Sequence, residues 1–129
     1  MKYKYITLVV FIFLSCMEEN KKQIENQLYH IVLFQFKDST SEAKIEIIKK
    51  AALELSKIKG VENLTWGQNV SPEKLNKGLT HSLTMTFKNE YDRDSIYLPH
   101  PTHVDFGEVF VPELENLVVY DYWLSLIHI

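Results

Sequence analysis

The residues best suited to chemistry lie in one short segment, Tyr97–Gly107, which holds two of the five histidines together with a tyrosine and an aspartate. Pro99 and Pro101 keep the residues before them extended, so a helix is expected to begin only at about Pro101, a favourable first helical residue. From there His103 falls at helical spacing with Phe106, on the side that should meet the core. A histidine on the side that should meet the core calls for a chemical explanation, because an imidazole exchanges protons near neutral pH.

Each histidine also has a structural explanation. His81 lies on the apolar side of an alternating strand, which is typical of a hydrogen-bonded core or interface histidine. His30 begins an apolar strand and can bond across the fold, and His100, between two prolines, can cap the following helix through its ring. For His103, ligand contact or catalysis and a buried structural hydrogen bond both stay open.

The same segment does not predict a metal site. His100 and His103 are three residues apart with Asp105 nearby, but His100 precedes the helix, so the two rings need not converge, and no further histidine or cysteine ligand follows at suitable spacing. The sequence also lacks a glycine-rich phosphate loop, a Ser-His-Asp order and a redox cysteine pair. We therefore expect no metal and no cofactor.

The elements that must position this segment begin with a strand over residues 28–37, which is apolar on both faces, as in a central strand covered on two sides. Ser39 and Glu42 then form a capping box that starts a helix, and Gly60 is expected to end it in the left-handed conformation.

Three further strands and two short helices complete the pattern. The strands are expected over residues 61–70, with Gly67 as a possible bulge, over 79–87, where apolar and hydroxyl residues alternate, and over 117–123. The helices are expected over 91–98 and 101–110. This βαββαβ order predicts an α+β, ferredoxin-like fold, in which one four-stranded antiparallel sheet carries its helices on one face. Since the other face is left uncovered, we expect a homodimer that pairs sheet to sheet.

The N-terminus resembles the signal of a bacterial lipoprotein. Lys2 and Lys4 precede an apolar run over residues 6–14 that is too short to span a bilayer, and Ser15 and the single cysteine, Cys16, follow. We expect a signal peptide over residues 1–15, lipidation of Cys16, a polar tether over 16–27 and a membrane-anchored location in the cell envelope. The alternative is an ordinary signal peptide with a chance cysteine.

Charge argues against nucleic acid as a partner. Without Lys2 and Lys4, 12 of the 14 basic residues remain against 17 acidic ones, and no basic patch interleaved with aromatic residues is present. At the other end, residues 124–129 resemble the translated end of a sequencing adapter, and we exclude them, His128 included, from the domain.

Taken together, these segments resemble the stress-responsive A/B barrel (Dabb) family, and the resemblance covers Tyr29 to Tyr122. It is carried by residues 30–38 (HIVLFQFKD), 66–70 (WGQNV), 77–81 (KGLTH), 86–87 (TF), 97–107 (YLPHPTHVDFG) and 121–122 (DY). The resemblance implies one Dabb domain over residues 28–123, with the dimeric barrel fold of that family.

The resemblance also implies roles for individual residues. In a plant polyketide cyclase of this family, the histidine that ends the His-Pro-x-His motif is the general base, and a tyrosine shortly before the motif orients the substrate. By position these are His103 and Tyr97. The implied cavity lies between sheet and helices, and the residues expected to contact the ligand are His30, Phe34, His81, Leu83, Met85 and Phe106.

We therefore expect a lipid-anchored protein that binds a small apolar or carbonyl-containing molecule. As an enzyme it would be a cofactor-free cyclase, lyase or isomerase with a histidine base. The alternative is a non-enzymatic stress-response, ligand-binding or dimerisation module.

Overall fold

The computed structural model describes residues 27–124. The expected signal peptide, Cys16, the tether up to residue 26 and residues 125–129 of the excluded tail lie outside these described residues. Between residues 27 and 124, no helix combines the length and the apolar character needed to cross a bilayer.

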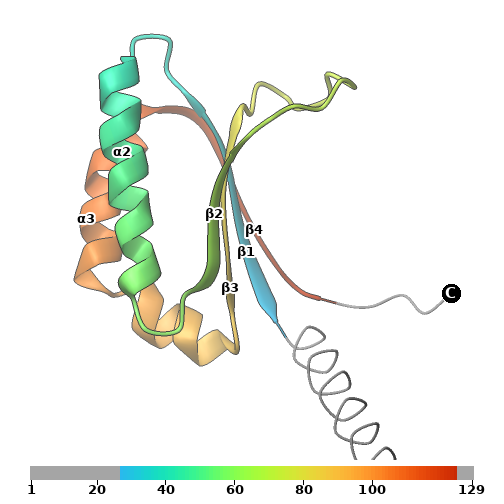
Figure 1. Ribbon diagram of the computed structural model, residues 1–129. Coiled ribbons are helices and arrows are strands. Elements are labelled where there is room, and N and C mark those ends of the chain that lie inside the picture. Colours follow the sequence, from blue (N-terminus) through green and yellow to red (C-terminus); the bar gives the residue numbers. More distant parts are fainter. Residues whose placement is uncertain (1–26, 125–129) are drawn as a thin grey trace, which may run out of the picture.

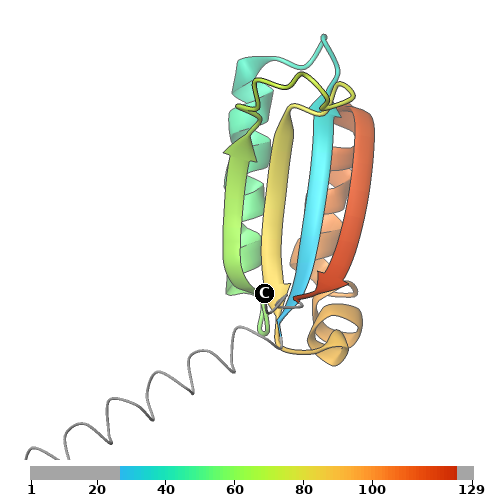
Figure 2. The same cartoon turned by 90° about the vertical axis from the view of Figure 1, so that its right-hand side faces the viewer.

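Four antiparallel strands form one sheet, and the helices lie on one of its faces (Figure 1). The strands are β1 (Leu28–Phe36), β2 (Glu62–Gln68), β3 (His81–Phe87) and β4 (Leu114–Trp123). Their spatial order is β2-β3-β1-β4 (Figure 2). The helices are α2 (Glu42–Glu54), α3 (Pro101–Phe110), the 3₁₀ turns η1 (Leu55–Lys57) and η3 (Val111–Glu113), and the short π-helix η2 (Asp92–Tyr97). The predicted ferredoxin-like plan is confirmed.

Strand β1 is the central strand that its apolar sequence predicts, since it pairs with β3 on one side and β4 on the other. Along β1, every second residue from Leu28 to Phe36 is buried toward the helices, and the residues between them are half-buried on the opposite face. This alternation places His30 on the helix-covered face, in the same row as Val32 and Phe34.

The opposite face of the sheet carries a continuous apolar and aromatic surface, which we call the open face. It consists of Tyr29, Ile31, Leu33, Val118, Tyr120 and Tyr122, which the register places side by side on β1 and β4. Val118 is 43% and Tyr120 61% exposed. Among residues 27–124, no helix lies over this face (Figure 1).

Helix α2 begins later than the capping box predicts. Ser41, not Ser39, is the N-cap, and its Oγ accepts the backbone N–H of Lys44. The Thr40 N–H donates to the Lys37 carbonyl, and this turn delays the helix. Gly60 adopts the expected left-handed conformation, with φ 93°. It does not end the helix as predicted, because α2 ends at Glu54 and η1 at Lys57, and Ile58 is already extended.

The irregularity of β2 lies near Asn63 and not at Gly67. The register with β3 shifts between Glu62 and Thr65, and Asn63 has φ 52°, which asparagine tolerates better than most residues. Gly67 stays in regular pairing opposite Ser82. A Cβ at Gly67 would approach the Ser82 Oγ to 2.9 Å, so the serine side chain would have to shift to admit a larger residue.

The remaining boundaries differ modestly from expectation. Strand β3 starts at His81, where residue 79 was expected, and β4 starts at Leu114, where 117 was expected. The helix expected over 91–98 is a π-helix, in which the Leu98 N–H donates to the Arg93 carbonyl. Helix α3 has the predicted bounds, Pro101–Phe110.

Candidate functional site

A cavity of about 280 Å³ lies between α3 and the helix-facing side of the sheet, next to strand β4. It is lined by His30, Val32, Leu83, Tyr97, Leu98, His103, Phe106, Gly107, Phe110, Val111, Leu117 and Val119. Leu117 and Val119 belong to the edge strand and remain 43% and 54% exposed, although the register turns them toward the helices. The cavity therefore opens along the edge of the sheet at β4.

The break between η2 and α3 orients His103. In a continuous helix the Leu98 carbonyl would accept the Thr102 N–H, but that N–H donates to the His100 Nδ1 at 3.2 Å. The ring of His100 is thus the N-cap of α3, as predicted. The Leu98 carbonyl is left to accept a hydrogen bond from His103 Nδ1 at 2.9 Å. Because a carbonyl only accepts, the His103 proton lies on Nδ1, and Nε2 of the neutral ring carries a lone pair.

The environment of His103 favours this neutral form. Burial lowers the pKa of His103 below its ordinary value of 6.5, and the bond to the Leu98 carbonyl opposes that shift. A neutral imidazole with a free Nε2 at neutral pH is the state that a general base requires.

Tyr97, the last residue of η2, supplies a hydroxyl beside this base. Its side chain is 2% exposed, and its ring centroid lies 4.4 Å from that of His103. Within residues 27–124 the Tyr97 hydroxyl has no hydrogen-bond partner. Every fully enclosed side-chain N or O atom in this part of the chain does have one, so the Tyr97 hydroxyl is not enclosed. Because Tyr97 lines the cavity, its hydroxyl reaches the cavity. Burial, and then the negative charge of Asp121, raise the pKa of Tyr97, so the hydroxyl stays protonated and able to donate.

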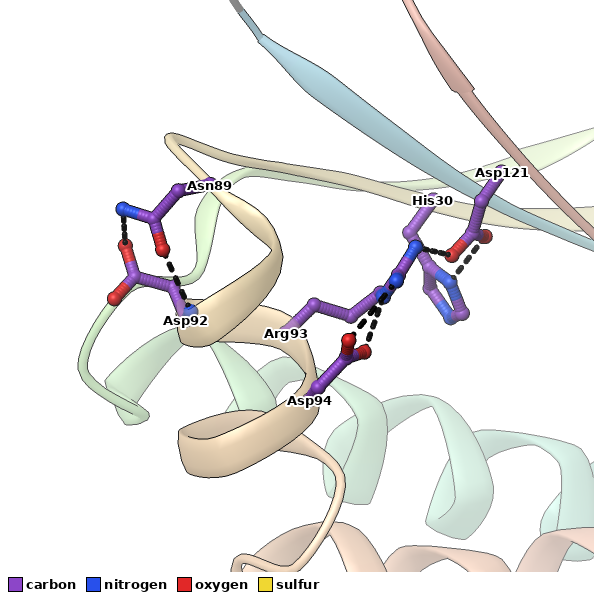
Figure 3. Close-up of polar contacts among 6 residues, drawn as sticks. All are labelled: His30, Asn89, Asp92, Arg93, Asp94 and Asp121. Carbon is purple, nitrogen blue, oxygen red and sulfur yellow. Dashed lines mark hydrogen bonds and ion pairs between the residues drawn. The ribbon is translucent and has the colours of Figure 1, made fainter.

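His30 forms the third polar group of the cavity. Its Nδ1 lies 2.7 Å from Asp121 Oδ1 on the neighbouring strand, and Arg93 Nη1 donates to the other carboxylate oxygen at 2.7 Å (Figure 3). The ring centroid of His30 lies 5.8 Å from that of Tyr97, so Tyr97 is flanked by the two histidines. The bond across the fold that was anticipated for His30 is present, and His30 also lines the cavity.

The structure brings together only part of the expected contact set. His30, Leu83 and Phe106 line the cavity with Tyr97 and His103. Phe34 and Met85 do not line it; they are 0% and 1% exposed in the core.

His81 also lies away from the cavity. It pairs with Phe34, about 13 Å along β1 from His30 at the usual rise per strand residue. Both of its ring nitrogens have protein partners, Thr80 and Gln68, and it lines a smaller groove of about 220 Å³. These contacts match the structural explanation of His81 and separate it from the cavity residues.

Two residues of the site were missed as functional candidates. Asp121 is an acidic residue within the apolar run Leu117–Trp123, a signal that could have marked it, whereas nothing local in the sequence marks Arg93. No group of three or more His, Cys, Asp or Glu side chains suited to a metal ion occurs among residues 27–124.

Comparisons with known proteins show the family of the chain. A family model described as the Stress responsive A/B Barrel Domain (Dabb) matches residues 28–124. The chain is 36% identical over 107 residues to stress-response A/B barrel domain-containing protein HS1 of Arabidopsis thaliana, covering 82% of this chain and 94% of that protein. It is 34% identical over 95 residues to olivetolic acid cyclase of Cannabis sativa, covering 72% and 92%.

Solved structures extend the likeness to the fold. The crystal structure of At3g17210 from Arabidopsis thaliana has a TM-score of 0.72 at 33% identity, covering 79% of this chain and 99% of that one. A dimeric ferredoxin-like protein of unknown function from Thermobifida fusca has a TM-score of 0.66 at 20% identity, covering 76% and 91%, which is a likeness of fold alone.

The lowered pKa of His103 predicts how stability depends on pH. Because the unfolded chain takes up this proton at higher pH than the folded one, the contribution of His103 to the free energy of unfolding is complete above about pH 7 and falls as the pH drops through 6.5. In His103→Asn, whose amide can still reach the Leu98 carbonyl, urea unfolding should show a smaller loss of stability between about pH 7.5 and 5.5.

The matched control is His81→Asn, since burial also lowers the pKa of His81. His81→Asn should also reduce the loss of stability between about pH 7.5 and 5.5. The reductions caused by His81→Asn and His103→Asn should add in the double variant, because the two residues share no contact. An unchanged profile in His103→Asn would contradict the lowered pKa of His103.

Proposed function

Because the chain belongs to the stress-responsive A/B barrel (Dabb) family, we propose that it binds a small, largely apolar carbonyl compound in this cavity and moves a proton on it. The proposal is carried by one observation: the ring of His103, whose Nδ1 is bonded to Leu98, lies 4.4 Å centroid to centroid from the ring of Tyr97, and both line the cavity with His103 Nε2 and the Tyr97 hydroxyl unpartnered among residues 27–124. The relative named as a cyclase supports it, since the Dabb resemblance assigns the base and the substrate-orienting tyrosine to these two positions.

The proposed reaction uses the two side chains in sequence. His103 Nε2 takes a proton from the carbon next to the carbonyl, and the electron pair of the broken C–H bond moves toward the carbonyl oxygen, which becomes an enolate. The Tyr97 hydroxyl donates to that oxygen as its charge develops. The imidazolium of His103 then returns its proton to the product, so that the protein regains its starting state.

The walls of the cavity suit a small apolar molecule. Apart from the histidines, Tyr97 and Gly107, the lining is aliphatic or aromatic, with Phe106 and Phe110 stacked on the α3 side. Such walls exclude water and strengthen hydrogen bonds to the developing charge. The volume, about 280 Å³, lies at the lower end of ordinary ligand pockets.

The test begins with a thermal-shift screen of small carbonyl compounds, followed by turnover assays on each compound that binds. His103→Asn should keep binding within a few-fold but lower kcat by about 10²- to 10⁴-fold, the usual contribution of a general base. Tyr97→Phe should lower kcat as well, because the enolate oxygen loses its donor.

His81→Asn is the control, because this histidine lies outside the cavity. Its kcat should match that of the unmodified chain. Equal losses in His81→Asn and His103→Asn, or full activity in His103→Asn, would contradict the assignment of the base. Ligands that bind with no turnover at all would instead favour the non-enzymatic binding module.

We also propose that two copies associate through the open face. Its apolar and aromatic side chains, Val118 and Tyr120 above all, are unusually exposed for a strand surface. The solved neighbour from Thermobifida fusca is described as dimeric, which supports a pair of copies as the occupant.

A charge in the middle of this face should separate the copies. Val118→Glu would bury a carboxylate between two sheets, so light scattering after size exclusion should report a monomer. Ile47→Glu is the matched control, because Ile47 is 57% exposed on α2, which lies on the other side of the sheet, and it should leave the oligomeric state unchanged. A dimer that persists in Val118→Glu would contradict this interface.

For location, we propose that a lipid on Cys16 holds the domain at a membrane of the cell envelope. The support is the sequence alone: a basic start, an apolar run of signal length, and then Ser15 and the single cysteine, Cys16. Metabolic labelling with an alkyne fatty acid in a bacterial host should label the chain and place it in the membrane fraction. Cys16→Ser should abolish both, and labelling that survives this substitution would contradict the anchor.

A further inference from the structure

Beside the cavity, three side chains from distant parts of the sequence form a continuous polar chain, which we call the Arg93 relay: Arg93, Asp121 and His30 (Figure 3). Arg93 Nη1 donates to Asp121 Oδ2, and Asp121 Oδ1 accepts from His30 Nδ1, each at 2.7 Å. The side chains are 19%, 23% and 8% exposed. Contacts this short and this well shielded from water are stronger than surface ion pairs.

The relay is held at its outer end by a second carboxylate. Arg93 Nε and Nη2 donate to the two oxygens of Asp94, at 2.6 and 3.2 Å, so the guanidinium plane is fixed from both sides. The bond with Asp94, and then that with Asp121, raise the pKa of Arg93, which therefore stays charged. A fixed guanidinium holds one oxygen of Asp121 and leaves the other directed at His30.

We propose that Arg93 is a positioning residue that acts through Asp121 to hold His30 in a single tautomer, with the proton on Nδ1 and the lone pair of Nε2 facing the cavity. His30 lines the cavity, and its Nδ1 is hydrogen-bonded to Asp121. Every fully enclosed side-chain N or O atom among residues 27–124 has a partner, so His30 Nε2, which has none there, is not enclosed. Nε2 is therefore the ring nitrogen that a ligand meets.

This tautomer of His30 indicates which further group the ligand carries, an inference that rests on the proposed function. The cavity wall then presents two hydrogen-bond acceptors, His103 Nε2 and His30 Nε2, with one donor, the Tyr97 hydroxyl, between them. The ring centroid of Tyr97 lies 4.4 Å from that of His103 and 5.8 Å from that of His30. Tyr97 matches a carbonyl oxygen, and His30 matches a hydroxyl that donates. The site is built for a carbonyl compound that also carries a hydroxyl group.

A simpler role for Arg93 is mechanical. Arg93 and Tyr97 lie on the same π-helix, so the ion pair with Asp121 could serve only to attach η2 to β4. In that case loss of Arg93 would lower stability but would leave the tautomer of His30 unchanged. The tautomer therefore distinguishes a positioning role from an attachment.

The experiment is ¹⁵N NMR of the histidine rings in the unliganded protein, in which the two tautomers have distinct nitrogen shifts. The unmodified chain should show His30 with a protonated Nδ1 and an unprotonated Nε2. Arg93→Gln should shift both nitrogens toward averaged values, and Arg93→Lys, which keeps the charge but not the fixed plane, should shift them less and serves if the first variant fails to fold. Asp121→Asn should also alter them, because an amide can donate to Nδ1.

The matched control is Asp94→Asn, which weakens the outer contact of Arg93 and leaves the bond to Asp121 in place. It should retain the His30 pattern, and the shifts of His81, which contacts none of these residues, should stay constant in every variant. Unchanged His30 shifts in both Arg93 variants would overturn the positioning role, whatever the screen for turnover finds.

The ligand class has its own test. Diacetone alcohol and methyl isobutyl ketone share one carbon skeleton and differ by a hydroxyl group. In NMR titrations the hydroxylated compound should bind about three- to tenfold more tightly, and Arg93→Gln should reduce that preference. Equal affinities would overturn the hydroxyl-bearing class, while the tautomer measurement would still decide the role of Arg93.

Discussion

The carbonyl oxygen of Leu98 would accept the Thr102 N–H if the chain stayed helical through this segment. The prolines at 99 and 101 prevent that, and His100 captures the Thr102 N–H instead. The oxygen left over binds Nδ1 of His103 and so leaves Nε2 as the nitrogen of the candidate base that can accept a proton. One interruption of a helix thus sets the tautomer of His103 and begins α3.

The same interruption separates α3 from the π-helix that carries Tyr97 and Arg93. Because the Leu98 N–H bonds back to the Arg93 carbonyl, η2 closes as one wide turn directly before the break. Tyr97 is thereby placed between two histidines that come from different elements, β1 and α3. The chemistry proposed for the cavity depends on this convergence more than on any single side chain.

Strand β4 gives the sheet its two functional surfaces. As an edge strand it leaves Leu117 and Val119 as the open wall of the cavity, while Val118 and Tyr120 point to the open face. A slip of one residue in its pairing with β1 would exchange these two sets and remove Asp121 from His30. The register of one edge strand therefore supports the ligand site, the proposed interface between copies and the Arg93 relay together.

Much of this was predictable from local patterns. The βαββαβ order, the central position of β1, the bounds of α3 and the cap at His100 all follow from periodicity and proline chemistry, and the membership of the Dabb family follows from the motif around His103. The start of α2 did not follow, because the Thr40 N–H closes a turn onto the Lys37 carbonyl and the Thr40 hydroxyl is held by Glu113, a contact that no local pattern shows. Alternation likewise placed Phe34, His81 and Met85 on the correct face of the sheet but said nothing of how far along it the cavity extends.

By itself, the sequence determined which residues lie on which face and where the helix must break, because both depend on neighbours within a few positions. Only the tertiary structure decided which of those residues meet. Asp121 lies 91 positions from His30 in the chain, and Arg93 28 positions from Asp121, so their contacts arise only from strand register and the placement of η2. The candidate base was visible in the sequence, whereas the network that orients the second histidine exists only in the folded sheet.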